Sequence, residues 1–324
     1  MKQLAVEDER HVQFVIDAMN TRDIYYHILE CKKISNLYRM INSLRILKSS
    51  KFDYVKRKAL ELVKDCYTSS GGFAPEKTYP PNVSSTRAAL QVLHICESDA
   101  YYKKEFDRAK TAKFLMNLQT GSGGFANDEF GDVDTRVDCC AISSLKMLEL
   151  LEKNDFRRES LEVPLDLKKY PEIDSNGLVR HILRCYDTGG GFGQVEGAEG
   201  HAAQTFCCIS TLKILGLLNT VDLDDVTAFI AQNQHENGGL MGRVNKKPDS
   251  CYSFWSYATL KMTGGEDSID KKKLIEFIRS CEHEEGGFSD QPGNVPDIYH
   301  QMFSLAALVM LGVIDGELSP SMCI

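Results

Sequence analysis

A short glycine motif recurs along the chain and constrains its fold more than any other feature. The sequence GGF or GGL begins at Gly71, Gly123, Gly190, Gly238 and Gly286. The successive spacings are 52, 67, 48 and 48 residues, and the long one contains a charged insertion over roughly residues 152–174. Regular periods of about 50 residues are typical of stacked or circular repeat architectures.

Each repeat is predicted to be a pair of helices. An amphipathic stretch precedes the glycines, as in KALELVKDCYTSSGGF, and a more apolar stretch follows a polar loop, as in TFCCISTLKILGLL. We expect the glycines to end the first helix, because glycine adopts left-handed backbone conformations at little cost. A helix that is apolar over most of its surface lies inside a protein, so the second helix of each pair is predicted to be the inner one. No alternating strand pattern competes with this interpretation.

The expected fold class is therefore all-α, with residues 1–324 forming a single domain of five or six helix pairs. Such pairs can close into an α/α barrel, a toroid in which the inner helices surround a lumen. An open superhelix fits the same repeat. In a closed ring, the loops that precede the inner helices gather at one end, and we expect the functional site there.

The composition excludes several classes of protein. Lys and Arg number 38 against 46 Asp and Glu, so no basic excess supports nucleic-acid binding. The N-terminal MKQLAVEDER lacks the apolar core of a signal peptide, and the longest apolar run, MFSLAALVMLGVI, is too short to span a bilayer. The 11 cysteines are odd in number and several lie in apolar runs, which indicates free thiols in a reducing compartment. We expect a cytoplasmic protein without a transmembrane segment.

Three potential metal ligands come at the start of two consecutive inner helices. Asp249 and Cys251 lie two residues apart, and His300 occupies the matching place one repeat later. A carboxylate, a thiolate and an imidazole suit Zn²⁺, and three protein ligands leave a fourth position open, as in catalytic zinc sites. Bound zinc would hold an incoming thiol as its thiolate near neutral pH. Taken singly, these residue types are more often a helix N-cap, a core thiol and a hydrogen-bonded imidazole, but their matching positions favour a metal site.

Basic residues lie close to these ligands in the sequence. Arg243 and Lys246, together with His201 and Tyr252, could form a cradle for a diphosphate, because guanidinium and ammonium groups bind phosphate oxygens. A solvated basic loop is the alternative.

Aromatic residues follow the same ligands. Tyr252, Phe254, Trp255 and Phe206 could form the wall of an apolar slot, in which aromatic faces would stabilise a developing allylic cation. The alternative is ordinary core packing.

The segments GHAAQTFCC, GGLMGRVNKKPDSCYSFW and GGFSDQPGNVPDIYHQMF resemble the β subunits of protein prenyltransferases. The resemblance covers nearly the whole chain and is strongest from Gly189 to Gly312. It implies an α/α barrel and an obligate heterodimer with a helical-repeat α subunit. By matching positions it implies that Asp249, Cys251 and His300 bind Zn²⁺, that His201, Arg243, Lys246 and Tyr252 contact the diphosphate, and that Phe254 and Trp255 line the isoprenoid pocket.

Within this family the resemblance is mixed. DTRVDCCA and HAAQTFCC resemble the Rab geranylgeranyltransferase (type II) β subunit, which implies geranylgeranyl transfer from geranylgeranyl diphosphate to C-terminal cysteines of Rab GTPases presented by an escort protein. SFW, the NK of GRVNKKPD and Tyr299 are instead similar to farnesyltransferase, which acts on CaaX proteins. The type I geranylgeranyltransferase is a third alternative. The Rab-type resemblance is the stronger.

Three further positions carry expectations from the resemblance. Ser35 matches a small residue that leaves room for the longer lipid in the geranylgeranyl enzyme. Arg39 stands where the Rab-type enzyme carries tryptophan, and a guanidinium facing an apolar cavity is costly unless it is paired. Asp290 matches a position associated with Mg²⁺ in farnesyltransferase, so a Mg²⁺ ion is possible there; a turn residue is the alternative.

Two other classes fit the repeat. Terpene cyclases also use helical double barrels, and DVDTR at residues 132–136 faintly resembles a cyclase acid motif. Cyclase chemistry needs no thiol-binding zinc site, so the metal content separates the two. A non-enzymatic helical-repeat scaffold predicts that no metal is bound and that the polar residues at the helix starts are individually dispensable.

Overall fold

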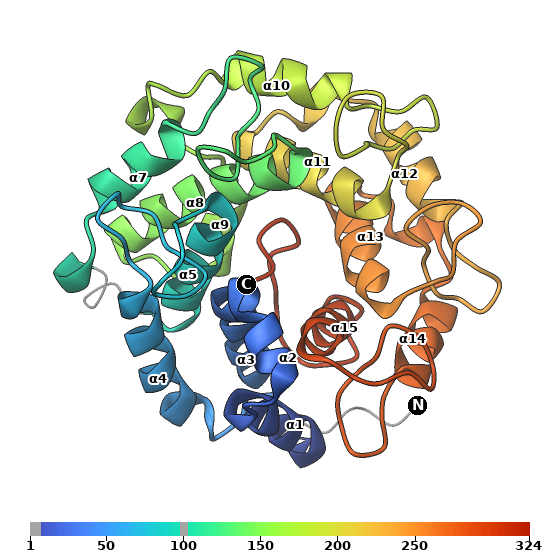
Figure 1. Cartoon of the computed structure of the whole chain (residues 1–324). Coiled ribbons are helices and arrows are strands. Elements are labelled where there is room, and N and C mark those ends of the chain that lie inside the picture. Colours follow the sequence, from blue (N-terminus) through green and yellow to red (C-terminus); the bar gives the residue numbers. More distant parts are fainter. Residues whose placement is uncertain (1–7, 98–102) are drawn as a thin grey trace.

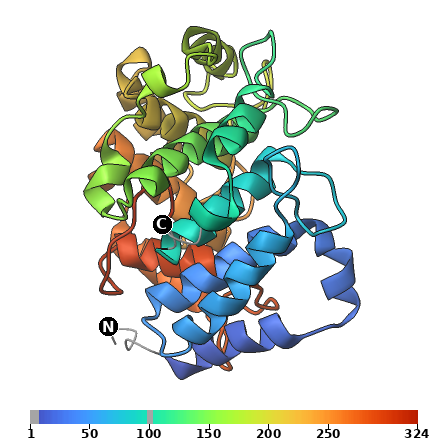
Figure 2. The same ribbon diagram turned by 90° about the vertical axis from the view of Figure 1, so that its left-hand side faces the viewer.

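The computed structural model describes residues 8–97 and 103–324. Within these ranges the regular elements are helices, and β pairing is limited to isolated bridges. The helices form two concentric layers around a lumen, seen down the ring axis in Figure 1 and from the side in Figure 2. The inner layer comprises α3 (Lys33–Ile46), α5 (Val83–Ile95), α8 (Thr135–Lys153), α11 (Ala202–Leu215), α13 (Ser250–Thr263) and α15 (Ile298–Met310). The outer layer comprises α1 (Glu9–Asn20), α4 (Phe52–Asp65), α7 (Arg108–Met116), α10 (Ser175–Arg184), α12 (Leu223–Ala231) and α14 (Lys271–Ser280).

The ring of helices is closed. Each inner helix packs against the next one, and the last, α15, packs against the first, α3. This arrangement confirms the predicted α/α toroid and rules out the open superhelix. The pair α1 and α3 has no glycine motif and completes the ring; the short α2 (Ile24–Ile28) and a 3₁₀ turn (Glu30–Lys32) connect its two helices.

The inner and outer layers differ in burial as the sequence predicted. The inner helix α11 buries side chains on all sides, whereas the outer helix α10 buries a single stripe of four residues. The charged insertion forms the short α9 (Arg158–Glu162) and a 3₁₀ turn (Leu167–Lys169). All of the cysteines carry free thiols, as predicted. No helix in residues 8–97 and 103–324 is both long enough and apolar enough to cross a membrane.

The repeated glycines do not end the outer helices, so that prediction was wrong. The outer helix α10 ends at Arg184. Gly190, with a φ of +94°, then lies in the turn between Tyr186 and Phe192, which form an isolated bridge. The first glycine of each motif approaches the backbone of the next outer helix so closely that a Cβ atom has no room. The glycine is therefore required by a turn and a close backbone approach rather than by helix termination.

The last glycine motif joins the two ends of the ring. A Cβ atom at Gly286 would lie 2.4 Å from the carbonyl oxygen of Arg10 in α1. The guanidinium of Arg10 also donates to Asp8 at 2.8 Å and to Glu282 at 2.9 Å, and the N–H of Gly287 donates to His11 Nδ1 at 3.0 Å. These contacts hold α1 in the outer position of the sixth helix pair.

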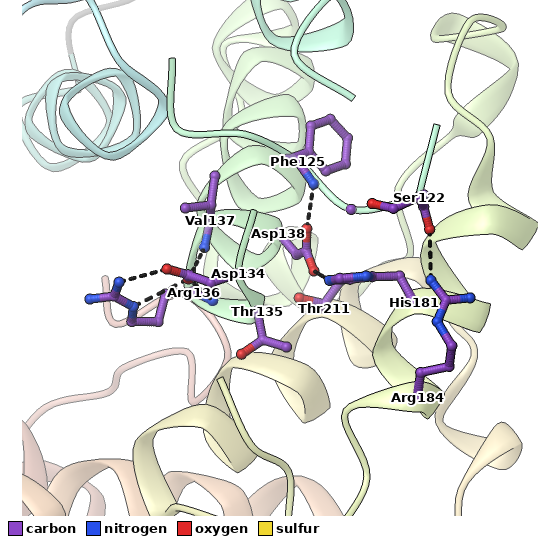
Figure 3. A network of polar contacts seen from close by, with 12 residues as sticks. Ser122, Phe125, Asp134, Thr135, Arg136, Val137, Asp138, His181, Arg184 and Thr211 are labelled. Atoms are coloured by element: carbon purple, nitrogen blue, oxygen red, sulfur yellow. Dashed lines mark hydrogen bonds and ion pairs between the residues drawn. The ribbon is translucent and has the colours of Figure 1, made fainter. Parts of the chain in front are cut away.

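One repeat contains a buried acid–base pair (Figure 3). In other repeats, Thr86 and Thr205 accept a hydrogen bond from the N–H of the motif phenylalanine, at 3.0 and 2.9 Å. In the second repeat the acceptor is Asp138, 2.7 Å from the nitrogen of Phe125. The second carboxylate oxygen of Asp138 lies 3.4 Å from His181 Nε2. In the other repeats, the outer helix places a phenylalanine ring, instead of a histidine, against the second glycine of the motif. Burial raises the pKa of Asp138 to about 8 and lowers the pKa of His181.

We expect the double substitution Asp138→Thr with His181→Phe, which introduces the threonine of two other repeats and the phenylalanine of the other outer helices, to stabilise the protein most above neutral pH. The pKa of Asp138 rises from 3.8 to about 8 on folding, so the folded state retains a proton that the unfolded state has lost. The contribution of Asp138 to the free energy of unfolding therefore falls as the pH rises from about 4 to about 8. The double variant should lose this slope and gain roughly 1–3 kcal/mol at pH 8, measured by urea denaturation across pH. The single variant His181→Phe, which leaves Asp138 without its partner, should be destabilised. Identical pH slopes in native and double-variant protein would contradict the expectation.

Candidate active site

The three predicted metal ligands converge at the end of the ring where the inner helices begin. Asp249 is the N-cap of α13, and its Oδ1 accepts a hydrogen bond from the N–H of Cys251 at 2.8 Å. Cys251 is buried in the first turn of α13, and His300 lies in the first turn of α15. His300 Nε2 is 3.4 Å from Asp249 Oδ1, and one donor atom of each residue lies within 4.8 Å of the others. Asp249 thus caps a helix and is at the same time one of the three converging donors.

A fourth residue orients this donor group. Asp297, the N-cap of α15, accepts a hydrogen bond from His300 Nδ1 at 2.7 Å, which turns Nε2 towards Asp249 and Cys251. Such a carboxylate partner commonly fixes the tautomer of a metal-binding histidine. The sequence placed Asp297 beside the ligands without assigning it this role.

The electrostatics of the donor group suit a divalent cation. Burial opposes protonation of His300, but the hydrogen bonds that its imidazole donates to the carboxylates of Asp249 and Asp297 outweigh it and raise the pKa of His300 to about 9. Burial, with the neighbouring Asp249 carboxylate, raises the pKa of the Cys251 thiol. A bound cation would favour the thiolate and the neutral imidazole instead. The chemistry of one carboxylate, one thiol and one imidazole fits Zn²⁺.

A second group of donors, Asp8, His11 and Glu282, also converges. The guanidinium of Arg10 already bridges its two carboxylates, and His11 Nδ1 is occupied by a backbone N–H. Arg279 adds a second ion pair to Glu282 at 3.5 Å, so this group joins the two ends of the ring through ion pairs of its own.

Of the four predicted diphosphate contacts, His201 and Tyr252 touch each other, and Arg243 follows the glycine on which they pack. His201 is the N-cap of α11; its Nδ1 accepts from Ala203, and its Nε2 lies 3.3 Å from the hydroxyl oxygen of Tyr252. Both rings pack against Gly242, the residue that precedes Arg243. Arg243 forms an ion pair with Glu199 at 2.6 Å. Lys246 lies in the same loop and is exposed to solvent.

An aromatic wall continues from this cradle into the lumen. Trp255 is half-buried, and its ring contacts those of Tyr252, Tyr299 and Phe303 at centroid distances of 5.7, 5.9 and 5.0 Å. Phe303 was missed in the sequence, although its place three residues after His300 puts it on the same helix face.

Phe254 packs against the residues of this wall. Its side chain is completely buried, with rings of Phe206 and Phe303 at 5.6 and 5.3 Å. Its role in lining an isoprenoid pocket stays a prediction.

Arg39 meets the wall from α3. Its guanidinium lies 4.9 Å from the ring centre of Tyr299, and its Nη1 donates to Asn36 Oδ1 at 2.8 Å. Burial lowers the pKa of Arg39. An aromatic face and an amide thus supply the partners that the sequence analysis required for this arginine. Ser35 is half-buried one helical turn earlier.

Asp290 shapes the loop before α15. Its carboxylate accepts from Asn294 Nδ2 at 2.8 Å, and its carbonyl oxygen accepts from the N–H of Ser250 at the start of α13. These contacts are those of a turn residue, and Mg²⁺ binding at Asp290 stays a prediction.

Within the DVDTR segment, Asp132 is exposed to solvent, whereas Asp134 holds the start of an inner helix. Asp134 is the N-cap of α8, and its carboxylate pairs with Arg136 at 2.6 Å (Figure 3). The same carboxylate accepts a hydrogen bond from Gln194 at 3.2 Å. This carboxylate is therefore engaged in holding the helix start.

Comparisons with known sequences agree on the family. The family model described as the prenyltransferase alpha-alpha toroid domain matches residues 6–324. The chain is 31% identical to the geranylgeranyl transferase type-2 subunit beta of Saccharomyces cerevisiae, over 78% of this chain and 73% of that protein. It is 29% identical to the Candida albicans protein of the same name, over 78% and 72% of the two chains. A farnesyltransferase subunit beta from Arabidopsis thaliana is 23% identical over 78% of this chain and 48% of its own length.

Comparisons with solved structures agree on the fold. Candida albicans protein geranylgeranyltransferase-I, complexed with GGPP, superimposes with a TM-score of 0.81 at 23% identity, covering 99% of this chain and 96% of that one. The ent-copalyl diphosphate synthase of Streptomyces platensis shares the toroid with a TM-score of 0.59 at 16% identity, over 87% and 51% of the two chains. The toroid is thus common to cyclases and protein prenyltransferases, whereas the sequence relationship distinguishes between them. The chain belongs to the β-subunit family of the protein prenyltransferases.

Proposed function

We propose that this chain is the catalytic β subunit of a Rab-type (type II) protein geranylgeranyltransferase. It would transfer a geranylgeranyl group from geranylgeranyl diphosphate to C-terminal cysteine thiols of Rab-type GTPases. It would act in the cytoplasm, in a heterodimer with an α subunit, on a substrate presented by an escort protein. The observation that carries the chemistry is the convergence of Asp249, Cys251 and His300 beside an aromatic wall.

The proposed reaction uses positioning and charge more than proton transfer. Asp249, Cys251 and His300 would hold Zn²⁺, which when bound lowers the pKa of a substrate thiol so that it reacts as the thiolate. Asp297 keeps the imidazole of His300 in the orientation needed for ligation. No residue of the chain has to act as a general base.

The cradle residues would stabilise the leaving diphosphate. His201 and Tyr252 present polar atoms to the same space, and Arg243 would exchange its exposed partner Glu199 for phosphate oxygens, which bind guanidinium more strongly. Lys246 would add a charge from its exposed position in the same loop. Trp255 would shield the first carbon of the lipid from water and face its developing positive charge. A Mg²⁺ ion at Asp290 would require that carboxylate to release Asn294.

The Rab-type assignment is supported by the identity to two type-2 subunits and by the segments HAAQTFCC and DTRVDCCA. The second candidate is a CaaX farnesyltransferase or type I geranylgeranyltransferase. It is favoured by Tyr299, which packs against Trp255 and Phe303 in the wall.

A competition experiment separates the candidates. The chain would be co-expressed with its α subunit and given farnesyl and geranylgeranyl diphosphate together, with a Rab protein plus escort and a CaaX protein as acceptors. We expect geranylgeranyl transfer to the Rab protein alone, and its loss on chelation of zinc. Farnesyl transfer to the CaaX protein would replace the Rab-type assignment by the second candidate.

A further inference from the structure

Two arginine side chains point into the lumen from adjacent inner helices. Arg39 on α3 and Arg87 on α5 are each only partly exposed. The guanidinium of Arg39 donates to Asn36 Oδ1 at 2.8 Å, and that of Arg87 donates to the hydroxyl of Ser143 on α8 at 2.9 Å. The surroundings of Arg87 also include Cys207 on α11. In the part of the chain that the structure describes, neither guanidinium forms an ion pair with a carboxylate.

A partly buried guanidinium without a counter-ion is costly. The Nε atom of Arg39 is buried and has no hydrogen-bond partner among the described residues. Burial lowers the pKa of Arg39, and the positive charge of Arg87 lowers it further, whereas the carboxylate of Asp297 raises it without forming an ion pair. An anion that entered the lumen here would therefore be attracted by two positive charges and would find an unused N–H donor.

The position of Arg39 decides which anion can reach it. Its guanidinium lies 4.9 Å from the ring centre of Tyr299, and that ring lies 5.1 Å from the imidazole of His300. A single ring thus separates the arginine from the candidate metal ligands. The cradle is farther away, because the ring of Tyr252 contacts Trp255, which in turn contacts Tyr299. A diphosphate held in the cradle would be kept from Arg39 by the rings of the aromatic wall.

The acceptor of the proposed reaction would bring an anion to this place. Its thiol would react beside Asp249, Cys251 and His300, and the acceptor cysteine is close to the C-terminus of its chain, which ends in a carboxylate. An extended chain advances about 3.3–3.6 Å per residue, so a carboxylate one to three residues beyond the thiol could reach across the ring of Tyr299. A planar guanidinium binds the two oxygens of a carboxylate through parallel hydrogen bonds.

We propose that Arg39, supported by the charge of Arg87, binds the C-terminal carboxylate of the acceptor chain and thereby selects cysteines close to a free chain end. The inference rests on the proposed function and names a specificity-determining residue for it. It also gives a role to the arginine that stands where the Rab-type enzyme carries tryptophan.

The test compares two forms of one acceptor with the heterodimer. A Rab protein, presented by its escort, is prepared by peptide ligation with either a C-terminal carboxylate or a C-terminal carboxamide, and kcat/KM for geranylgeranyl transfer is measured for each. We expect the carboxamide to lower kcat/KM of the native enzyme by at least about tenfold, because a charge-assisted hydrogen bond is lost. Arg39→Gln should react equally with the two acceptors. Arg39→Lys, which keeps the charge but not the planar fork, should retain part of the discrimination.

Arg45→Gln is the matched control. Arg45 lies on the same helix, donates to Asn42 three residues before it as Arg39 donates to Asn36, and also has a buried nitrogen without a partner. This variant should discriminate between the two acceptors as the native enzyme does, so loss of packing is distinguished from loss of recognition. Native discrimination in Arg39→Gln, or equal reaction of the native enzyme with both acceptors, would overturn the proposal.

Binding of geranylgeranyl diphosphate tests the other source of an anion. Measured by competition with a fluorescent isoprenoid diphosphate, it should be unchanged in Arg39→Gln. Weakened lipid binding with intact discrimination between the acceptors would show that the arginine serves the diphosphate and would overturn the proposal. If a CaaX protein is prenylated in place of the Rab protein, the same pair of chain ends on that acceptor supplies the test. A native heterodimer that prenylates neither would refute the proposed function and this inference with it, whereas transfer without discrimination would refute the inference alone.

Discussion

Replacing Cys251 by alanine is expected to abolish the zinc binding proposed for the heterodimer and to reduce prenyl transfer by more than about 100-fold. Cys251 offers the only thiol among the three converging donors, and loss of one ligand in three removes both affinity for the metal and the means of activating a substrate thiol. Metal content of the purified heterodimer and single-turnover transfer at saturating lipid would be measured together.

Cys185→Ala provides the matched control for this prediction. Cys185 is as buried as Cys251, at 1% against 4% exposed, but it lies outside the converging donors. It should keep its zinc and its turnover. A Cys251→Ala protein with native zinc content and native transfer would show that the donor group is a helix-capping arrangement without a metal. That result would favour the alternative of a non-enzymatic helical-repeat scaffold.

The position of the site follows from what each repeat needs in order to fold. Every inner helix after a glycine motif begins with a side chain that caps it at the same end of the ring, because the first N–H groups of a helix have no partner within the helix. A polar residue at this position is therefore tolerated in every repeat, and five such residues face the same end. The caps are Asn82, Asp134, His201, Asp249 and Asp297. Asp249 serves both as cap and as candidate ligand, and His201 both as cap and as part of the cradle.

The repeat made the helix pairs and the inner and outer layers predictable, since burial follows directly from apolar periodicity. Closure of the ring could not be predicted in the same way. It depends on α1, which has no glycine motif, reaching the position beside Gly286. That contact joins residues far apart in sequence and follows from the accumulated curvature of the helix pairs, which no local pattern encodes.

The candidate ligands were predictable because they occupy equivalent positions in successive repeats. The rest of the site depends on neighbours from other helices. The guanidinium of Arg39 finds the ring of Tyr299 only because α3 and α15 meet at the ring closure. Similarly, residues 318–324 have no periodic pattern, and their backbone is held by buried donors on α3 and α5.

Gly123→Ala is expected to be the most destabilising of the glycine substitutions. The φ of Gly123 is +97°, and an added Cβ would lie 2.1 Å from the carbonyl oxygen of Gly177 in the next outer helix. The strained backbone costs about 1–2 kcal/mol, and the forced separation of two packed backbones adds about 1–3 kcal/mol. We therefore expect a loss of roughly 2–5 kcal/mol in the free energy of unfolding, measured by urea denaturation.

Two other glycines divide this loss into its parts. Gly121 lies in the same loop with nothing within 4 Å of an added Cβ, so Gly121→Ala should change stability by less than about 0.5 kcal/mol. Gly293 has a φ of +83° but also open space around it, so Gly293→Ala should show the backbone strain alone. If Gly123→Ala lowered the free energy of unfolding no more than Gly293→Ala, the motif glycine would be needed only for the positive φ of the turn. A larger cost would mean that the first glycine of each motif holds neighbouring repeats together, which is why the pattern repeats around the whole toroid.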